Sequence, residues 1–300
     1  MEWALAIPSL QGTTEINGFL TGKKAAFVAD IKEMFEERFG TVRFTRLYYG
    51  QEFCEKAISG KEDMKRAFNI SEEEGLSFSY VTPYVTETGL TKLKIRLDKL
   101  AAEKPDSEVV INDWGVLDWL NDQQLTLTPV LGRLMNKILR DPRMPNKSIN
   151  TVNSQTADCL RTSFLTGVGM KNLLDQYHVR RIELDHPPQG LDPKLSDWGY
   201  QSSLYLPYGV VTTGRICLMQ SWGLEDKDRF KAAMVCDQKC GRYWLEMSDP
   251  SGKVKNTANW KLMQKGNTIF YRQSRKFAVK ALEQAVSYGI SRIVFQPEPL

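Results

Sequence analysis

The sequence predicts an α/β fold, a (β/α)8 TIM-like barrel that is incomplete or embellished. Short apolar stretches alternate with stretches of helical periodicity along the whole chain, and this alternation is typical of a mainly parallel sheet. There are about eight such strand-and-helix units, the number that closes a barrel of this class. Although 300 residues also fit two ordinary domains, the regular alternation favours a single barrel domain over residues 1–300.

The first half of the chain supplies five of the expected strands. Residues 3–7 are apolar and stop at Pro8, and residues 25–39 carry apolar side chains at helical spacing before Gly40, a typical helix C-cap. Further strands are expected at residues 42–49, 76–81, 108–113 and 127–132, and further helices at residues 61–74, 90–102, 133–139 and from residue 114.

The second half is less regular. An insertion rich in Asp, Pro, Asn and Ser is expected at residues 140–153, and a helical pattern follows at residues 154–177, interrupted near Gly167 and Gly169. Residues 209–247 form a turn-rich, cysteine-bearing loop region. The remaining strands are expected at residues 179–185, 202–207, 266–271 and 291–295, with a helix at residues 274–288.

Composition restricts the classes of function. The net charge of +4 neither requires nor excludes nucleic acid as a partner. No apolar run is long enough for a membrane span, and the first residues lack the pattern of a signal peptide, so we expect a cytoplasmic protein. With only two histidines and no Gly-x-Ser-x-Gly, His-Glu-x-x-His or Walker motif, the usual hydrolase and nucleotide-binding patterns are missing.

The five cysteines are the main candidates for chemistry. Disulfides are not expected in a reducing cytoplasm, which leaves metal ligands or buried free thiols. Cys217, Cys236 and Cys240 lie in the turn-rich region, and Cys54 follows the second expected strand. These four could meet in space and hold an iron-sulfur cluster, whereas Cys159 lies in a helical pattern and needs no special role. From the residues alone, free thiols, zinc and a cluster all stay open.

Other candidates lie at or just past predicted strand ends, the face of a barrel where chemistry occurs. Glu183 and Asp113 are candidate acids or bases, although Asp113 could instead cap a helix and Glu183 could pair with a neighbouring arginine. The candidate substrate-binding residues are Tyr84, Asn112, Tyr208 and Arg215. Packing, capping or a structural hydrogen bond is the alternative role for each of these four.

Five segments occur in an order that resembles a known family. They are residues 47–56, 110–116, 129–136, 181–184 and 207–217. Together they resemble the collagenase-like family of unassigned peptidases, in the short form typified by an anaerobic ubiquinone-biosynthesis protein, over about residues 40–275. The sequence departs from that pattern in the first forty residues, in the long charged loop 218–235 and in Cys159.

The resemblance implies a specific function. Members of this group bind a [4Fe-4S] cluster through four cysteines, which match Cys54, Cys217, Cys236 and Cys240. It also implies oxygen-independent hydroxylation of a quinone precursor or an RNA base, with prephenate as oxygen donor and a homologous partner chain. The alternatives are a non-catalytic subunit whose cluster is structural or carries electrons, and a peptidase as the family label suggests. For a peptidase, the sequence offers no nucleophile with a base and no metal-water arrangement.

Overall fold

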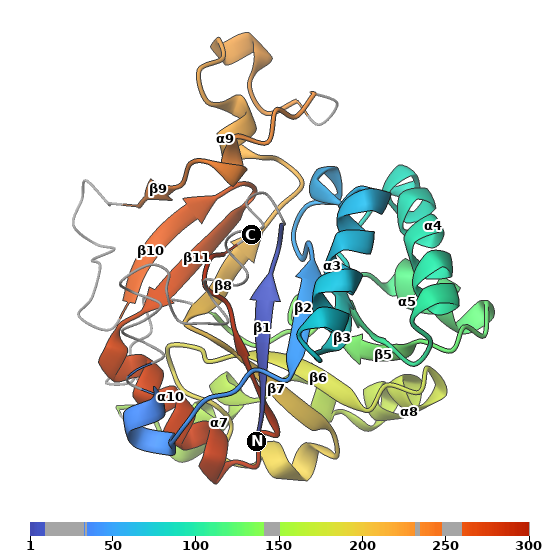
Figure 1. The fold of residues 1–300 in the computed structure, drawn as a ribbon. Coiled ribbons are helices and arrows are strands. Elements are labelled where there is room, and N and C mark those ends of the chain that lie inside the picture. Colours follow the sequence, from blue (N-terminus) through green and yellow to red (C-terminus); the bar gives the residue numbers. More distant parts are fainter. Residues whose placement is uncertain (10–32, 34, 141–150, 232–234, 248–259, 300) are drawn as a thin grey trace.

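A computed structural model describes residues 1–9, 33, 35–140, 151–231, 235–247 and 260–299. Within these residues, eight parallel strands close into a barrel in the order β1-β12-β7-β6-β5-β4-β3-β2 (Figure 1). The strands are β1 (Glu2–Ile7), β2 (Arg46–Gly50), β3 (Ser77–Val81), β4 (Glu108–Ile111), β5 (Thr128–Leu131), β6 (Arg181–Asp185), β7 (Gln201–Leu206) and β12 (Arg292–Phe295). The predicted (β/α)8 fold class is confirmed.

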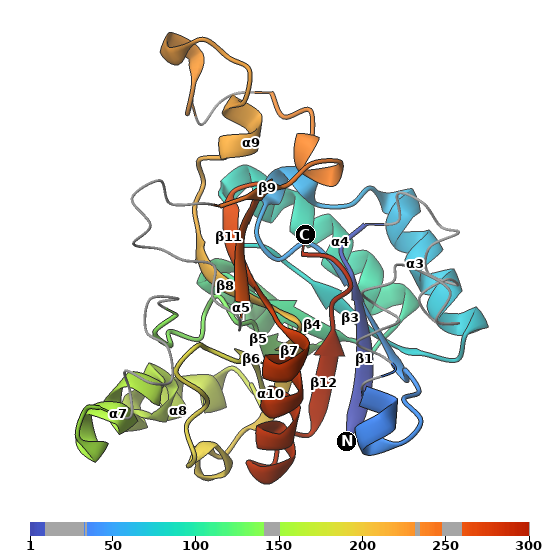
Figure 2. The ribbon, with the colours of Figure 1, turned by 90° about the vertical axis from the view of Figure 1, so that its left-hand side faces the viewer.

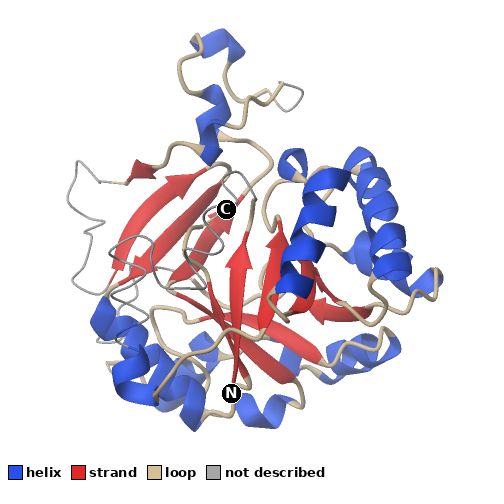
Figure 3. Cartoon of the chain, viewed as in Figure 1, coloured by secondary structure: helices blue, strands red, loops and turns tan. Residues whose placement is uncertain are grey.

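Helices cover the outside of the barrel (Figure 3). They include α3 (Lys61–Glu73), α4 (Glu87–Glu103), α5 (Trp114–Asp122), α7 (Ser154–Arg161), α8 (Val168–Gln176) and α10 (Arg275–Ser287). In α4 three leucines at helical spacing, Leu93, Leu97 and Leu100, are buried and pack in the core between helices and strands. No helix among the described residues combines the length and the apolar character that a membrane span requires.

Two predicted helices need comment. The helix predicted at residues 133–139 is wrong, because these residues form a turn and an extended segment. The side chain of Arg133 is completely buried, and the backbone N–H of Leu134 donates to Asn112 Oδ1 at 3.1 Å. A backbone N–H that would otherwise form a hydrogen bond within a helix therefore bonds to a side chain in another part of the fold. Of the helix predicted at residues 25–39, residues 35–39 are helical, and most of the rest lies outside the described residues, as does most of the predicted insertion (141–150).

A second, antiparallel sheet lies beside the barrel (Figure 1, left). Its order is β8-β11-β10-β9, made of β8 (Tyr208–Thr213), β11 (Thr268–Gln273), β10 (Trp260–Lys265) and β9 (Leu245–Glu246). The strand expected at residues 266–271 exists, but it belongs to this sheet, and strands lie at both ends of the region expected as a loop. Gly209 of β8 packs so closely against a tyrosine ring that a Cβ atom would lie 2.0 Å from Tyr271 Cζ.

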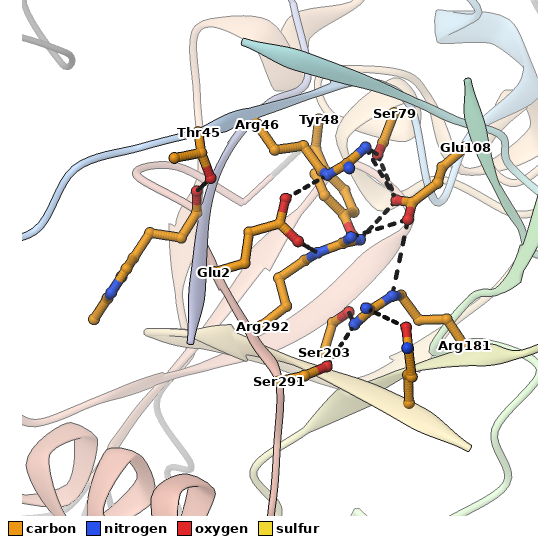
Figure 4. A network of polar contacts seen from close by, with 12 residues as sticks. Glu2, Thr45, Arg46, Tyr48, Ser79, Glu108, Arg181, Ser203, Ser291 and Arg292 are labelled. Carbon is orange, nitrogen blue, oxygen red and sulfur yellow. Dashed lines mark hydrogen bonds and ion pairs between the residues drawn. The ribbon is translucent and has the colours of Figure 1, made fainter. Parts of the chain in front are cut away.

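Charged side chains fill the barrel at the starts of its strands (Figure 4). Arg292 donates to both carboxylate oxygens of Glu108, at 2.6 and 2.9 Å, and to Glu2 at 2.6 Å. Arg46 donates to the other oxygen of Glu2 at 2.8 Å. Because these partly or fully buried charges are paired and multiply hydrogen-bonded, the barrel closes at this end with a polar layer instead of an apolar one.

Glu183 lies above this layer, inside the barrel, and is completely buried. Tyr48 receives a hydrogen bond from Arg292 and donates to Glu183 Oε1 at 3.0 Å. The other carboxylate oxygen has no hydrogen-bond partner among the described residues. Burial raises the pKa of Glu183 to about 7; the charge of Arg292 opposes this rise and that of Glu108 adds to it.

We expect the Glu183→Gln substitution to flatten the pH dependence of stability. The folded chain holds a proton on Glu183 up to about pH 7, whereas the unfolded carboxyl releases it near its ordinary pKa of 4.5. Stability is therefore lost as the pH rises through this window, by about 3 kcal/mol. Urea unfolding at pH 5 and pH 8 measures this. If the free energy of unfolding changed by the same amount between pH 5 and pH 8 in the wild type and in the variant, the raised pKa of Glu183 would be contradicted.

Candidate metal centre

The four predicted ligand cysteines line one cavity. Its volume is about 610 Å³, and its walls include Cys54, Cys217, Cys236 and Cys240, all partly buried. Cys217, Cys236 and Cys240 lie on a segment that extends from the second sheet (Figures 1 and 2). This segment lies at the end of the barrel where β1 and the other parallel strands have their carboxyl ends. Cys159 is exposed on α7 and does not line this cavity. The structure thus brings together thiols from two distant parts of the chain, residue 54 and residues 217–240.

The turn that bears Cys54 is fixed from two sides. Gly50 ends β2 with φ of +127°, and a Cβ atom there would lie 2.3 Å from Val81 O, so only glycine suits this close approach. After Cys54, the carboxylate of Glu55 accepts hydrogen bonds from the backbone N–H and the hydroxyl of Thr86, at 2.6 and 2.8 Å. Thr86 is the N-cap of α4. The turn is therefore held against a helix that packs on the barrel.

Side-chain amides join the remaining cysteine segments to this turn. The N–H of Gln220 in α9 (Leu218–Ser221) donates to Cys217 Sγ at 3.4 Å, a contact that stabilises a thiolate. Gln220 also accepts from Lys56 Nζ at 3.4 Å and donates to Val235 O at 3.2 Å. Gln238 donates to Lys56 O at 3.3 Å. These bonds tie both later segments to the residues that follow Cys54.

The thiols influence one another electrostatically. Burial raises the pKa of Cys54, and the neighbouring Cys236 and Cys217 raise it further. Burial also raises the pKa of Cys217, which backbone N–H groups and Lys56 partly offset. The pKa of Cys240 is raised to about 11 by burial and then by the other three thiols. Such mutual repulsion arises when thiolates are gathered in one place, and a bound cation relieves it.

Four cysteine thiols are a donor set that metal centres in proteins use. Four cysteines are the usual ligands of a [4Fe-4S] cluster, in which each thiolate binds a different iron atom. A single zinc ion needs its ligands around one point, at about 2.3 Å from the metal. Among the described residues, no three Cys, His, Asp or Glu side chains are arranged to hold one ion. Four thiols beside one cavity are a donor set that a [4Fe-4S] cluster uses.

Two of the four predicted substrate-binding residues line the cavity. Tyr84 and Arg215 are part of its wall, and burial raises the pKa of Tyr84. Asn112 is buried elsewhere, where its amide donates to Thr82 O at 2.9 Å. Tyr208 packs in an apolar cluster with Phe270 and is not part of the wall.

Neither candidate acid or base lines the cavity. Asp113 is the N-cap of α5, where its carboxylate accepts from the N–H groups of Gly115 and Val116 at 2.8 and 3.4 Å. Its second oxygen accepts from Val85 N at 3.1 Å. Glu183 points into the barrel, as described above. Both arrangements match a structural role, and the described wall of the cavity contains neither histidine of the sequence.

Several residues of the site carry no pattern that sequence reasoning could use. Lys56, Arg66 and Asp63 add charge to the wall, together with Glu55. Asn267 contacts the segments of two cysteines from the turn between β10 and β11. The Gly-Asn pair at this turn signals a hairpin, but its hydrogen bonds reach backbone positions far away in the sequence.

We expect Gly89→Ala to destabilise the fold and to disturb the Cys54 turn. A Cβ atom at this position would lie 2.5 Å from Glu55 Oε2 and 2.8 Å from Val85 Cβ, so unfolding should become easier by about 1–3 kcal/mol. The matched control is Gly169→Ala on α8, where a Cβ atom meets nothing within 4 Å. That variant should be unchanged or more stable, by up to about 1 kcal/mol. Equal stabilities in urea unfolding would contradict the close packing of Gly89.

The site as a whole is a half-buried group of four thiols beside a cavity at the carboxyl ends of the barrel strands. In parallel barrels, this end is where function resides. Comparisons of this chain with protein-family models, with characterised proteins and with solved structures find no match.

Proposed function

We propose that this chain is an iron-sulfur protein in which Cys54, Cys217, Cys236 and Cys240 bind a [4Fe-4S] cluster. The observation that carries this proposal is the convergence of these cysteines, from two distant parts of the chain, on one cavity. The mutual influence of their pKa values supports it. When bound, such a cluster supplies electron transfer at the cavity wall.

We further propose that the protein acts in oxygen-independent hydroxylation, together with a homologous partner chain. The resemblance of the ordered segments to the collagenase-like family supports this, and so does a cavity of about 610 Å³ directly beside the thiols. Tyr84 and Arg215 line this cavity and could contact a substrate there. The substrate is then a quinone precursor or an RNA base, with prephenate as oxygen donor.

A second candidate function is that of a non-catalytic subunit. The cysteine-bearing segment exposes large aromatic side chains, which suit the surface of a partner protein. They are Trp222, Phe230, Tyr243 and Trp244, each about half exposed. In this case the cluster would support structure or carry electrons to the partner.

Turnover without oxygen separates the two candidates. The cluster-loaded chain, alone and with a homologous chain from the same organism, is incubated with prephenate and either a ubiquinone precursor or an RNA transcript. Mass spectrometry then detects the gain of one oxygen atom. Product from the isolated chain would reject the non-catalytic subunit, and product only with the partner would favour it. No product in any combination would contradict the hydroxylation proposal.

A further inference from the structure

Asn267 lies where two cysteine-bearing segments meet. It occupies the turn between β10 and β11 and is 9% exposed. Its amide nitrogen, Nδ2, donates to Phe53 O at 2.6 Å and to Gly214 O at 2.7 Å. Tyr84 OH lies 3.0 Å from the same nitrogen. One side chain thus contacts three segments that are far apart in the sequence.

The orientation of this amide follows from its neighbours. Phe53 O and Gly214 O are carbonyl oxygens, which only accept hydrogen bonds, so the nitrogen must face them. The amide oxygen accepts from Thr268 Oγ1 at 3.2 Å. The backbone adds a bond in the opposite direction, because Gly214 N donates to Asn267 O at 3.1 Å. The two hydrogens of the amide are therefore directed at the carbonyl groups of Phe53 and Gly214 and at the hydroxyl of Tyr84.

These two carbonyl groups lie next to proposed ligands. Phe53 directly precedes Cys54, and Gly214 lies three residues before Cys217. The first bond spans 214 residues of sequence and the second spans 53. Since each loop is bound to the same planar amide group, the separation of their backbones is set by that group.

We propose that Asn267 is a positioning residue that fixes the Cys54 loop against the Cys217 loop, so that the two thiols are pre-arranged for the cluster. This inference rests on the proposed cluster for its significance, but the clamp itself is a property of the chain. Residues that do not bind a metal themselves but contact its ligands fix the geometry of those ligands and tune the metal. Without such residues, the ligands of a metal site are not held at the distances that binding requires. Asn267 is part of the cavity wall, and the hydrogen bonds of its amide nitrogen go to oxygen atoms of neighbouring residues.

Four variants test the clamp in the full chain. Asn267→Ala removes both bonds, and Asn267→Ser retains a single donor. Asn267→Asp keeps the shape but presents a carboxylate oxygen to the two carbonyl groups, so a mere packing role would tolerate it and a clamp would not. The matched control is Gln264→Ala, because Gln264 is a buried amide of the same hairpin that donates only to Gly266 O, at 2.8 Å, among the contacts of the described residues.

The first readouts use the anaerobically loaded protein. Loss of iron to a chelator should be on the order of 10-fold to 100-fold easier in the Ala and Asp variants. The reduction potential and the electron paramagnetic resonance spectrum of the reduced protein should also shift, with the Ser variant intermediate. The Gln264→Ala control should match the wild type. Unchanged retention, potential and spectrum in Asn267→Ala and Asn267→Asp would overturn the inference.

The last readout needs no iron. In a background with Cys159, Cys236 and Cys240 replaced by serine, a bifunctional thiol reagent should link Cys54 to Cys217 quickly in the presence of Asn267 and more slowly in Asn267→Ala and Asn267→Asp. Equal linking rates would overturn the clamp. If the wild type binds no iron but the rates differ, the proposed cluster fails and the clamp stands. If iron binds and the linking rates are equal, the proposed cluster stands and the clamp fails.

Discussion

Replacing Cys54 with serine is expected to abolish stable cluster binding. Cys54 is the only proposed ligand in the first half of the chain, and its thiol faces the other three across the cavity wall. A hydroxyl is a poor substitute for the soft thiolate that iron-sulfur clusters use. The anaerobically purified variant should lose the brown colour and most of its iron. The same result is expected for Cys217→Ser, Cys236→Ser and Cys240→Ser.

Cys159→Ser is the matched control for this series. Cys159 is exposed on α7, away from the cavity, so its replacement should leave the iron content and the absorption spectrum unchanged. Iron content is measured by elemental analysis of equal amounts of folded protein. A Cys54→Ser variant that keeps the full iron content, or a Cys159→Ser variant that loses it, would contradict the assignment of the ligands.

The largest stability effect is expected for Arg133→Met. The guanidinium of Arg133 is completely buried and donates two hydrogen bonds to Glu52, at 2.7 and 2.8 Å, and one to Asp185 at 2.9 Å. It also stacks on the ring of Tyr205, 4.0 Å from its centroid. Its removal leaves two buried carboxylates with fewer partners, which should cost about 3–5 kcal/mol of the free energy of unfolding.

The control for this effect is Arg180→Met. Arg180 forms an exposed ion pair with Asp175, and such surface pairs contribute at most about 1 kcal/mol. Urea unfolding at neutral pH measures both variants. If the free energies of unfolding of Arg133→Met and Arg180→Met fell by equal amounts, the buried cluster around Arg133 would not stabilise the barrel mouth as described.

The barrel was predictable because its signals are local. An apolar stretch that ends at a turn, followed by a helical stripe such as Leu93, Leu97 and Leu100, marks each unit without knowledge of its neighbours. The second sheet was not predictable in this way. β8 and β11 pair across more than fifty residues, and a strand pattern does not reveal which sheet a strand joins. Arg133 was assigned to a helix because its tertiary partners leave no mark on local periodicity.

The gathering of four cysteines at one cavity could be predicted from the sequence, but the residues that hold their loops in place could not. Cys54 follows a strand, and three further cysteines cluster downstream, so a common face could be expected once a barrel was assumed. Asn267 and Glu55 act through hydrogen bonds to remote backbone and side-chain groups, which no spacing rule encodes. Asp113 shows the converse, because its position after a strand fits both a functional role and the helix cap that the structure contains.

The central claim, that four cysteines hold one [4Fe-4S] cluster, is tested most directly on the wild-type chain purified without oxygen. Iron, zinc and acid-labile sulfide are measured on the same sample, and electron paramagnetic resonance is recorded after reduction. We expect about four iron atoms and about four sulfides per chain, with the signal of a reduced [4Fe-4S] cluster. One zinc ion per chain, or a colourless protein that binds no iron after reconstitution, would contradict the claim.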